Sequence, residues 1–210
     1  VWLSLPATRE ELAEAMKALH ITANNPQDFF LNGYSTEAGR RVEIPFEWVR
    51  EADIDKLNFL AARLEEMTPA QLDKINAFMQ TDFKLDSLDK LIYYTYNTDY
   101  FVYIPEVYTR SDVGDYYLNE SGMVQMPEEW KAGIDKEEFG SNAALCENGR
   151  FTDYGYILKS GDGWKEVYAG KEVPEQYRIM HYPPPEHTSE NRIDYDAAVS
   201  ATSPPSVQKS

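Results

Sequence analysis

Residues 54–96 carry three successive apolar patterns of helical period, and this stretch most limits how the chain can fold. The three expected helices cover residues 54–67, 69–79 and 88–96. Thr68, followed by Pro69 and Gln71, has the residue types of a capped helix start. Helices this short are marginally stable in isolation, so they must pack on one another or on neighbouring segments. The sequence therefore predicts a central helical domain over residues 53–98.

The segments on either side of these helices mix helical and strand patterns. Thr8 and Glu11 have the spacing of a capping box, which predicts a helix ending near Leu19. Strands are expected over residues 1–6, 28–34, 41–44, 100–104 and 150–159, with 164–168 completing a hairpin. Short helices are expected over 111–118, 127–134 and 135–146. We therefore predict an α+β fold of three small domains, with an N-terminal α/β domain over 1–52 and a C-terminal α+β domain over 99–180.

Both ends of the chain differ from its middle. After Met180 a run of three prolines gives way to Ser, Thr and Pro without periodicity, which predicts a disordered tail over 181–210. The first residues resemble the middle of a strand, so we expect the N-terminal domain to be truncated at its start. No apolar run approaches the roughly 20 residues that span a bilayer, and no signal peptide is expected. Cys146 is the only cysteine, which favours a cytoplasmic location.

The charge balance narrows the classes of partner. The chain has 36 acidic and 20 basic residues and a net charge of −16. Such a chain is repelled by phosphate, so direct binding to nucleic acid or to an anionic membrane is disfavoured, whereas a basic protein groove would attract it. Residues 1–157 hold 28 of the acidic and 14 of the basic residues, so the excess lies outside the expected tail. Many proteins are acidic for solubility alone, and charge by itself does not separate these alternatives.

Residues 99–155 contain twelve acidic and only four basic side chains. The carboxylates occur singly or in short pairs, and on a helix a spacing of three or four residues places them about 5–6 Å apart. Duplex DNA carries a charge every ~1.7 Å of its axis, which such a scatter resembles better than a metal-binding cluster does. The alternative is the solvated face of an ordinary acidic protein. The candidate target-binding carboxylates are Asp99, Glu106, Asp112, Asp115, Glu120, Glu128, Glu129, Asp135, Glu137, Glu138, Glu147 and Asp153.

Motifs for catalysis or metal binding are missing from the sequence. It contains no zinc-ligand spacing, no phosphate-binding loop, no dinucleotide fingerprint and no Gly-x-Ser-x-Gly elbow. Cys146 is more typical of a small core residue than of a nucleophile. We therefore predict a protein that is not an enzyme and needs no cofactor or metal. A pair of catalytic carboxylates stays open as an alternative, because the acidic residues are so numerous.

Two stretches near the C-terminal end of the expected fold resemble a known family. Glu138-Phe139-Gly140, followed by the run over 147–157, is similar to the C-terminal signature of ArdA-type antirestriction proteins. Residues 114–117, 126–130 and 134–135 upstream, and 2–6 and 57–61 near the start, also match family positions in order. The resemblance covers about 1–157. Its signature residues are Gly140, Gly149, Phe151, Tyr154, Gly155 and Tyr156.

The resemblance implies a fold and a function. Members of the family are elongated, have three parts and dimerise through the C-terminal domain. They act as DNA mimics that occupy the DNA groove of type I restriction-modification enzymes, usually on behalf of a plasmid or conjugative transposon. Two other hypotheses keep part of this picture. The chain could mimic DNA toward a CRISPR effector or a nucleoid protein, or it could be a domain of a larger mobile-element protein.

Overall fold

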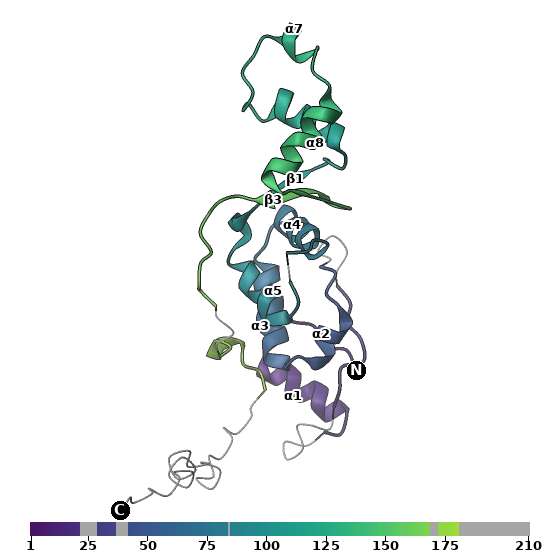
Figure 1. The fold of residues 1–210 in the computed structure, drawn as a ribbon. Coiled ribbons are helices and arrows are strands. Elements are labelled where there is room, and N and C mark those ends of the chain that lie inside the picture. The colour runs from purple at the N-terminus through teal and green to yellow at the C-terminus, as the bar shows by residue number, and fades with distance from the viewer. Residues whose placement is uncertain (22–28, 37–41, 84, 169–171, 181–210) are drawn as a thin grey trace, which may run out of the picture. The chain divides into compact units, whose positions relative to one another are not determined.

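The computed structural model describes residues 1–21, 29–36, 42–83, 85–168 and 172–180 (Figure 1). The tail expected over 181–210 lies outside these residues. The described part contains eight α-helices and one small sheet of three strands. It therefore belongs to the mixed α+β class that the sequence predicts.

Four helices begin where the sequence predicted a start, two of them from capping residues and two from apolar periodicity. Helices α1 (Arg9–Ala18) and α4 (Pro69–Met79) both open with a capping box. In α1 the Thr8 hydroxyl accepts from the Glu11 amide, and the Glu11 carboxylate accepts from the Thr8 amide at 2.7 Å. Helices α3 (Ile54–Glu65) and α5 (Leu88–Thr95) begin after an Asp and a Ser that cap them. These bonds satisfy amides that a helix start leaves unpaired.

The strands expected before residue 45 do not form in the described part of that region. Residues 1–6, 29–34 and 42–44 have no strand, and an unexpected helix, α2 (Phe46–Glu51), follows them. Within 42–44, and directly after 1–6, a backbone amide bonds to a side chain of the central helices instead. The Ala7 amide donates to Asn58 Oδ1 at 2.6 Å, and the Glu43 amide donates to Asn76 Oδ1 at 3.0 Å. A strand requires a neighbouring strand, and here helix side chains supply the partners.

One hydrophobic core draws residues from all three expected domains. Leu12 and Val42 come from the first segment, Leu60 and Ile75 from the second, and Ile157 from the third. Each of these side chains is buried. The division into three domains stays a prediction, and this main core contains side chains from Leu12 to Met180.

The sheet has the order β1-β3-β2 and is antiparallel throughout. Strands β1 (Phe101–Pro105), β2 (Arg150–Thr152) and β3 (Gly155–Lys159) compose it. Its two faces pack into different hydrophobic clusters, because successive side chains of a strand point to opposite sides. Ile157 packs into the main core, whereas Tyr156 and Leu158 belong to a second, smaller cluster on the other face. The sheet thus lies between the central helices and the helices described next.

Two strand predictions near the C-terminal end were wrong. The single strand expected over 150–159 is a tight hairpin, because the Thr152 hydroxyl binds the amides of Tyr154 and Gly155 and donates to the Gly155 carbonyl. The hairpin partner expected over 164–168 is not a strand. The Lys165 amide donates to the side-chain oxygen of the buried Asn97 at 2.6 Å, and the Lys165 carbonyl accepts from the side-chain nitrogen of Asn97 at 3.0 Å. A side chain from the connection between α5 (Leu88–Thr95) and the next turn thus replaces a strand partner.

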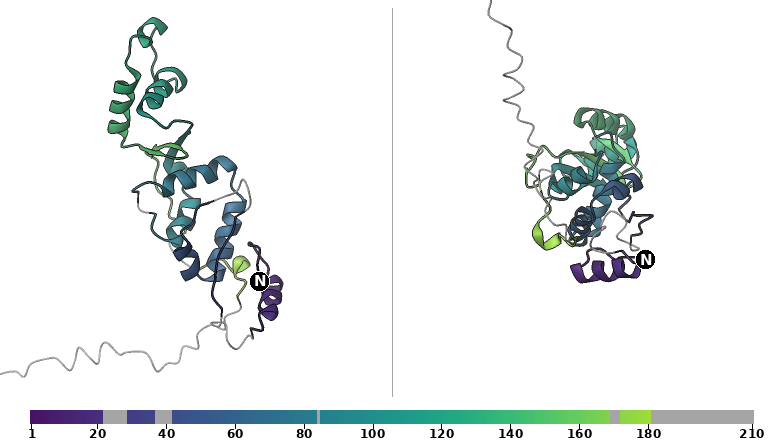
Figure 2. Two further views of the ribbon diagram at one scale, coloured as in Figure 1. Left: turned by 90° about the vertical axis from the view of Figure 1, so that its right-hand side faces the viewer. Right: turned by 90° about the horizontal axis from the view of Figure 1, so that it is seen from below.

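A helical subregion follows β1. It consists of α6 (Arg110–Asp115), the π-helical segment η2 (Tyr116–Glu120), α7 (Glu128–Lys131) and α8 (Lys136–Glu147). Figures 1 and 2 show α6 and α8 side by side, and these two helices are in contact. Glycine makes this closeness possible. A Cβ at Gly140 would lie 1.8 Å from the Arg110 carbonyl oxygen, and one at Gly114 would lie 2.0 Å from that of Lys136.

Replacing Gly140 with alanine should therefore separate α6 from α8. The new methyl group would meet backbone atoms rather than a flexible side chain, so the clash can be relieved only if one of the two helices shifts. We expect Gly140→Ala to lower the free energy of unfolding by about 3 kcal/mol, measured by urea denaturation. The control is Gly133→Ala, whose methyl group would meet the Trp130 carbonyl oxygen at an ordinary 3.5 Å. Equal stability of the two variants would contradict this account of the helix contact.

Candidate acidic target-binding surface

Six of the twelve candidate carboxylates are exposed and make no hydrogen bond or ion pair with any described residue. They occur in the 3-10 turn η1 (Thr98–Tyr100), just after β1, at the end of η2, in α7 and in the first turn of α8. These uncommitted carboxylates are Asp99, Glu106, Glu120, Glu129, Glu137 and Glu138. They are available to a partner without breaking any bond described within the protein.

Two other candidates are paired with lysines. Asp115 forms an ion pair with Lys136 and also accepts a hydrogen bond from Asn119 at 2.8 Å. The Lys136 hydrogen bond is the main cause that holds the pKa of Asp115 below its ordinary value. Glu128 pairs with Lys131 at 2.9 Å within α7. A partner that used these carboxylates would compete with the protein's own lysines.

Three candidates bond to backbone or amide groups of the chain. Asp112 accepts from the amides of Tyr108 and Thr109, and these residues hold its pKa low, with the Thr109 side chain as the largest cause. Asp135 caps α8 by accepting from the first amides of that helix, at 2.9 and 3.1 Å. Asp153 exchanges two hydrogen bonds with the Gln80 side chain. These three carboxylates help to shape the fold.

Glu147 has the most constrained carboxylate of the twelve. It accepts a hydrogen bond from the Tyr117 hydroxyl at 2.6 Å and another from the hydroxyl of the buried Tyr156. Burial, followed by the bond to Glu147, raises the pKa of both tyrosines. Glu147 therefore connects the end of α8 to η2 and β3, and it does not face a partner freely.

Helix starts account for part of the acidic pattern. Glu128 and Glu129 lie in the first turn of α7, and Glu137 and Glu138 lie in the first turn of α8. An acidic residue there interacts favourably with the helix dipole, by about 0.3–1 kcal/mol. Their position in sequence thus has a local cause, and their exposure is what makes them candidates for binding.

The cations of this stretch do little to offset the uncommitted carboxylates. Lys131 and Lys136 are engaged by Glu128 and Asp115, and Arg150 holds Asp82 through two nitrogens, at 2.8 and 3.2 Å. The fourth cation, Arg110, forms no ion pair with the residues that the structure describes. The six uncommitted carboxylates therefore outnumber the uncommitted cations of this stretch.

The signature residues pack the sheet against α8. A Cβ at Gly149 would lie 1.8 Å from the Tyr156 hydroxyl oxygen, and Gly155 has φ +141° beside the Ile104 carbonyl. The Phe151 ring lies 5.0 Å from that of Tyr156, and the Tyr154 carbonyl accepts from Tyr103 at 2.6 Å. With Gly140 between α6 and α8, the signature describes the fold of this region rather than contacts to a target.

The described residues contain no group of three or more His, Cys, Asp or Glu side chains that could hold a metal ion. Cys146 is exposed on α8, which corrects the expectation that it is a core residue. Among the helices of the described part, none is long and apolar enough to cross a membrane.

Fold and site together define an acidic α+β protein in which many of the candidate carboxylates are turned outward. The family model of the antirestriction protein ArdA matches residues 1–158. The chain therefore belongs to the ArdA family, as its signature residues predicted, and this is a family of antirestriction proteins. No curated protein matches the chain in a direct sequence comparison.

Proposed function

We propose that this protein inhibits a type I restriction-modification enzyme by occupying its DNA-binding groove. The uncommitted carboxylates would lie where the enzyme otherwise holds phosphates. The observation that carries the proposal is that six exposed carboxylates have no bonding partner in the described chain, while three of the four cations of residues 99–155 are already paired. Because such an enzyme meets DNA in the cytoplasm, the proposed site of action is there.

Contacts to phosphate explain how one surface could compete at any recognition sequence. DNA-binding proteins place much of their hydrogen bonding on the phosphate backbone, which carries no sequence information. Carboxylates fixed on a folded protein can satisfy the same lysines and arginines. A protein also avoids the cost of bending DNA, which is of order 1–6 kcal/mol for a site of 20–30 base pairs. Such a surface therefore requires carboxylates at the positions that DNA phosphates would occupy, and it requires no groups that resemble bases.

A direct competition experiment tests the proposal. Purified protein is titrated into a complex of a type I enzyme with labelled duplex DNA, and fluorescence anisotropy reports the displaced DNA. We expect displacement that weakens as salt rises, because both binding partners exchange counterions on association. Displacement that does not depend on ionic strength, or no displacement at low salt, would refute the mechanism.

We further propose that two copies associate through the region after residue 99. Leu145 is 80% exposed on α8, and Phe151 on β2 and Val102 on β1 are also exposed. Association that covers these side chains would remove apolar surface from water, which favours an interface. A dimer would double the number of carboxylates that a long DNA groove could contact.

Charge placed at Leu145 should break this dimer. We expect Leu145→Glu to be monomeric at concentrations where the unmodified protein is dimeric, because a buried unpaired carboxylate is costly at an interface. Sedimentation velocity measures the change. Met123→Glu is the matched control, since Met123 is 76% exposed and lies outside the helix and strands of the proposed interface. A dimer that tolerates Leu145→Glu would place the interface elsewhere.

A further inference from the structure

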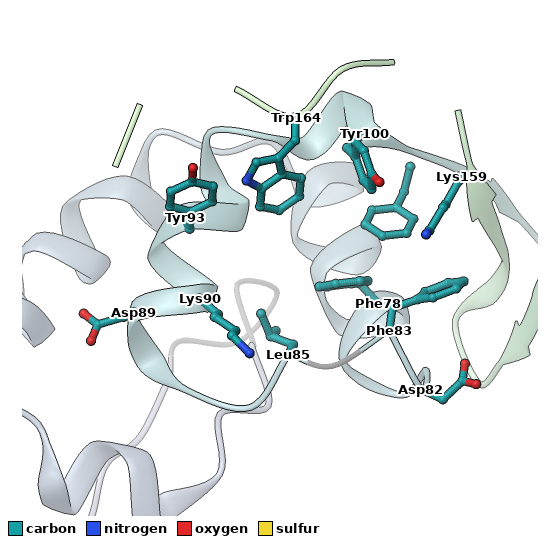
Figure 3. A pocket seen from close by; sticks show the side chains of 11 residues that line it. Phe78, Asp82, Phe83, Leu85, Asp89, Lys90, Tyr93, Tyr100, Lys159 and Trp164 are labelled. Atoms are coloured by element: carbon teal, nitrogen blue, oxygen red, sulfur yellow. The ribbon is translucent and has the colours of Figure 1, made fainter. Parts of the chain in front are cut away.

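A pocket of about 660 Å³ is lined by α4, α5, the sheet and the segment that follows it (Figure 3). This volume lies within the range of small-molecule sites. We call it the aromatic pocket, because six rings line it: Phe78, Phe83, Tyr93, Tyr100, Phe101 and Trp164. Lys159 and Trp164 lie beyond the residues that the family model matches, so the pocket is not contained in the family match alone.

The rings offer flat surfaces on two sides. Tyr93 and Trp164 are stacked, with ring centroids 5.1 Å apart and planes 15° apart, and Trp164 meets Tyr100 edge-on. Phe78 and Phe83 are also nearly parallel, at 18°. Figure 3 shows Trp164 and Tyr100 on one side of the pocket and Phe78 and Phe83 on the other. A planar aromatic group between these sides could stack on one wall and meet another edge-on.

The carboxylates at the rim are already bound within the protein. Asp82 is held by Arg150, and Asp89 is held by Lys56 at 3.0 Å and by the Tyr168 hydroxyl at 3.2 Å. A cationic ligand would therefore have to displace an internal partner to gain a carboxylate.

Of the two lysines that line the pocket, Lys159 differs from Lys90 in its ion pairing. Lys90 is paired with Asp86 at 2.8 Å, whereas Lys159 has no ion-pair partner within the described stretches of the chain. The Lys159 ammonium lies 5.7 Å from the centre of the Phe83 ring and 6.0 Å from that of Tyr100. The lining charge that remains available is thus positive, in a chain whose net charge is −16.

We propose that the aromatic pocket binds a small planar aromatic compound that carries one anionic group. The ring system stacks between the walls formed by Trp164 and Phe83, and the anion meets the Lys159 ammonium. A charge-assisted contact of this kind is about twice as strong as a neutral hydrogen bond, so it selects the anion over its neutral or cationic analogues. This activity is separate from the antirestriction surface and does not depend on it.

Isothermal titration calorimetry of the full chain with three probes tests the proposal. Naphthalenesulfonate has the ring and the anion, naphthylmethylammonium has the ring with a cation, and cyclohexanesulfonate has the anion without the aromatic ring. We expect naphthalenesulfonate to bind about tenfold or more tightly than either of the others. Equal binding of the ammonium probe, or no measurable binding of naphthalenesulfonate, would overturn the assignment.

Two variants locate the binding site. Lys159→Gln should weaken naphthalenesulfonate about tenfold and should not weaken the ammonium probe, because the variant loses an attraction for the anion and a repulsion of the cation. Trp164→Ala should weaken both naphthyl probes. Lys17→Gln, an exposed lysine on α1, is the matched control and should bind as the unmodified protein does. Full affinity for naphthalenesulfonate in Lys159→Gln would place the ligand elsewhere.

Discussion

Replacing the six uncommitted carboxylates by their amides will raise the concentration needed to displace DNA from a type I enzyme by about a hundredfold. The combined variant carries Asp99→Asn, Glu106→Gln, Glu120→Gln, Glu129→Gln, Glu137→Gln and Glu138→Gln. Each exposed carboxylate is expected to contribute only about twofold, because solvent screens a surface charge. The single variants should therefore differ little from the unmodified protein, and the loss should emerge on combination. Anisotropy competition measures all seven variants.

A matched control separates the position of the carboxylates from the total charge. It neutralises six exposed acidic residues elsewhere that make no hydrogen bond or ion pair with the described chain: Glu10, Glu14, Glu47, Asp73, Glu166 and Glu175. Both variants lose the same charge, so a general effect of charge would weaken them equally. We expect the control to retain most of its displacement activity. If the two lose activity to the same extent, the acidic surface defined here is not the binding surface.

The salt dependence of the affinity for the enzyme provides an independent comparison of the combined variant with the control variant. The slope of affinity against salt concentration counts the charges that engage the partner. The combined variant should show a shallower slope than the control variant between about 50 and about 200 mM salt. A loss of affinity without a change of slope would indicate that the substitutions disturbed the fold rather than the charge contacts.

The helices of this protein could be predicted from sequence because their signals are local. The Thr8 and Thr68 capping boxes, and the apolar stripes that follow them, lie within a few residues of the bonds they form. The structure of the described residues before 45 could not be predicted in the same way, and the strands expected there do not form. A short alternating pattern does not reveal whether a neighbouring strand exists, and here Asn58 and Asn76 bind those backbones instead.

Those asparagines left a signal in the sequence that periodicity alone did not use. Asn58 and Asn76 are buried within helices whose other buried side chains are apolar, apart from Asp55 of α3. A polar residue on an apolar face is costly unless it is hydrogen-bonded, so each one indicated a partner from outside its helix. Asn97 is also buried, between α5 and η1, and it holds the backbone of Lys165.

The acidic surface could be predicted in part. Composition located the stretch, but it could not separate free from committed carboxylates, because the partners are distant in sequence. Asp115 and Lys136 are 21 positions apart, Glu147 and Tyr117 are 30 apart, and Asp153 and Gln80 are 73 apart. Only the fold brings these groups together, and it removes half of the candidates from the set of uncommitted carboxylates.

Removing the Glu147 carboxylate, which is hydrogen-bonded within the protein, should cause a large loss of stability. Glu147→Ala leaves the Tyr117 and Tyr156 hydroxyls without their shared acceptor, and Tyr156 is fully buried. Each hydrogen bond to a charged group contributes about 1.5–3 kcal/mol, so we expect the free energy of unfolding to fall by about 4 kcal/mol. Urea denaturation measures the loss. Displacement of DNA at a concentration and temperature where the variant stays folded should change little.

Two comparisons show whether the loss comes from these bonds. Glu147→Gln keeps one acceptor oxygen and should lose less stability than Glu147→Ala. Glu138→Ala, on the same helix but exposed and uncommitted, should lose at most about 1 kcal/mol, which is its interaction with the helix dipole. If Glu147→Ala were no less stable than Glu138→Ala, the carboxylate would not hold η2 and β3 to α8.

The stability of the protein at alkaline pH provides a further test of the hydrogen bonds that join Glu147 to Tyr117 and Tyr156. In the folded protein the pKa of Tyr117 and of Tyr156 is raised above the ordinary 10.0, first by burial and then by Glu147. The unfolded chain therefore loses these protons first, and stability that is fully present below about pH 10 falls as pH rises further. Removing Glu147 lowers the folded pKa of both tyrosines toward the unfolded value. Burial still holds both folded pKa values above 10.0 in Glu147→Ala, so its stability should fall in parallel with that of the unmodified protein up to about pH 11. Above about pH 11 the fall should level off at a lower pH in the variant, and curves that stay parallel there as well would contradict the shared role of Glu147.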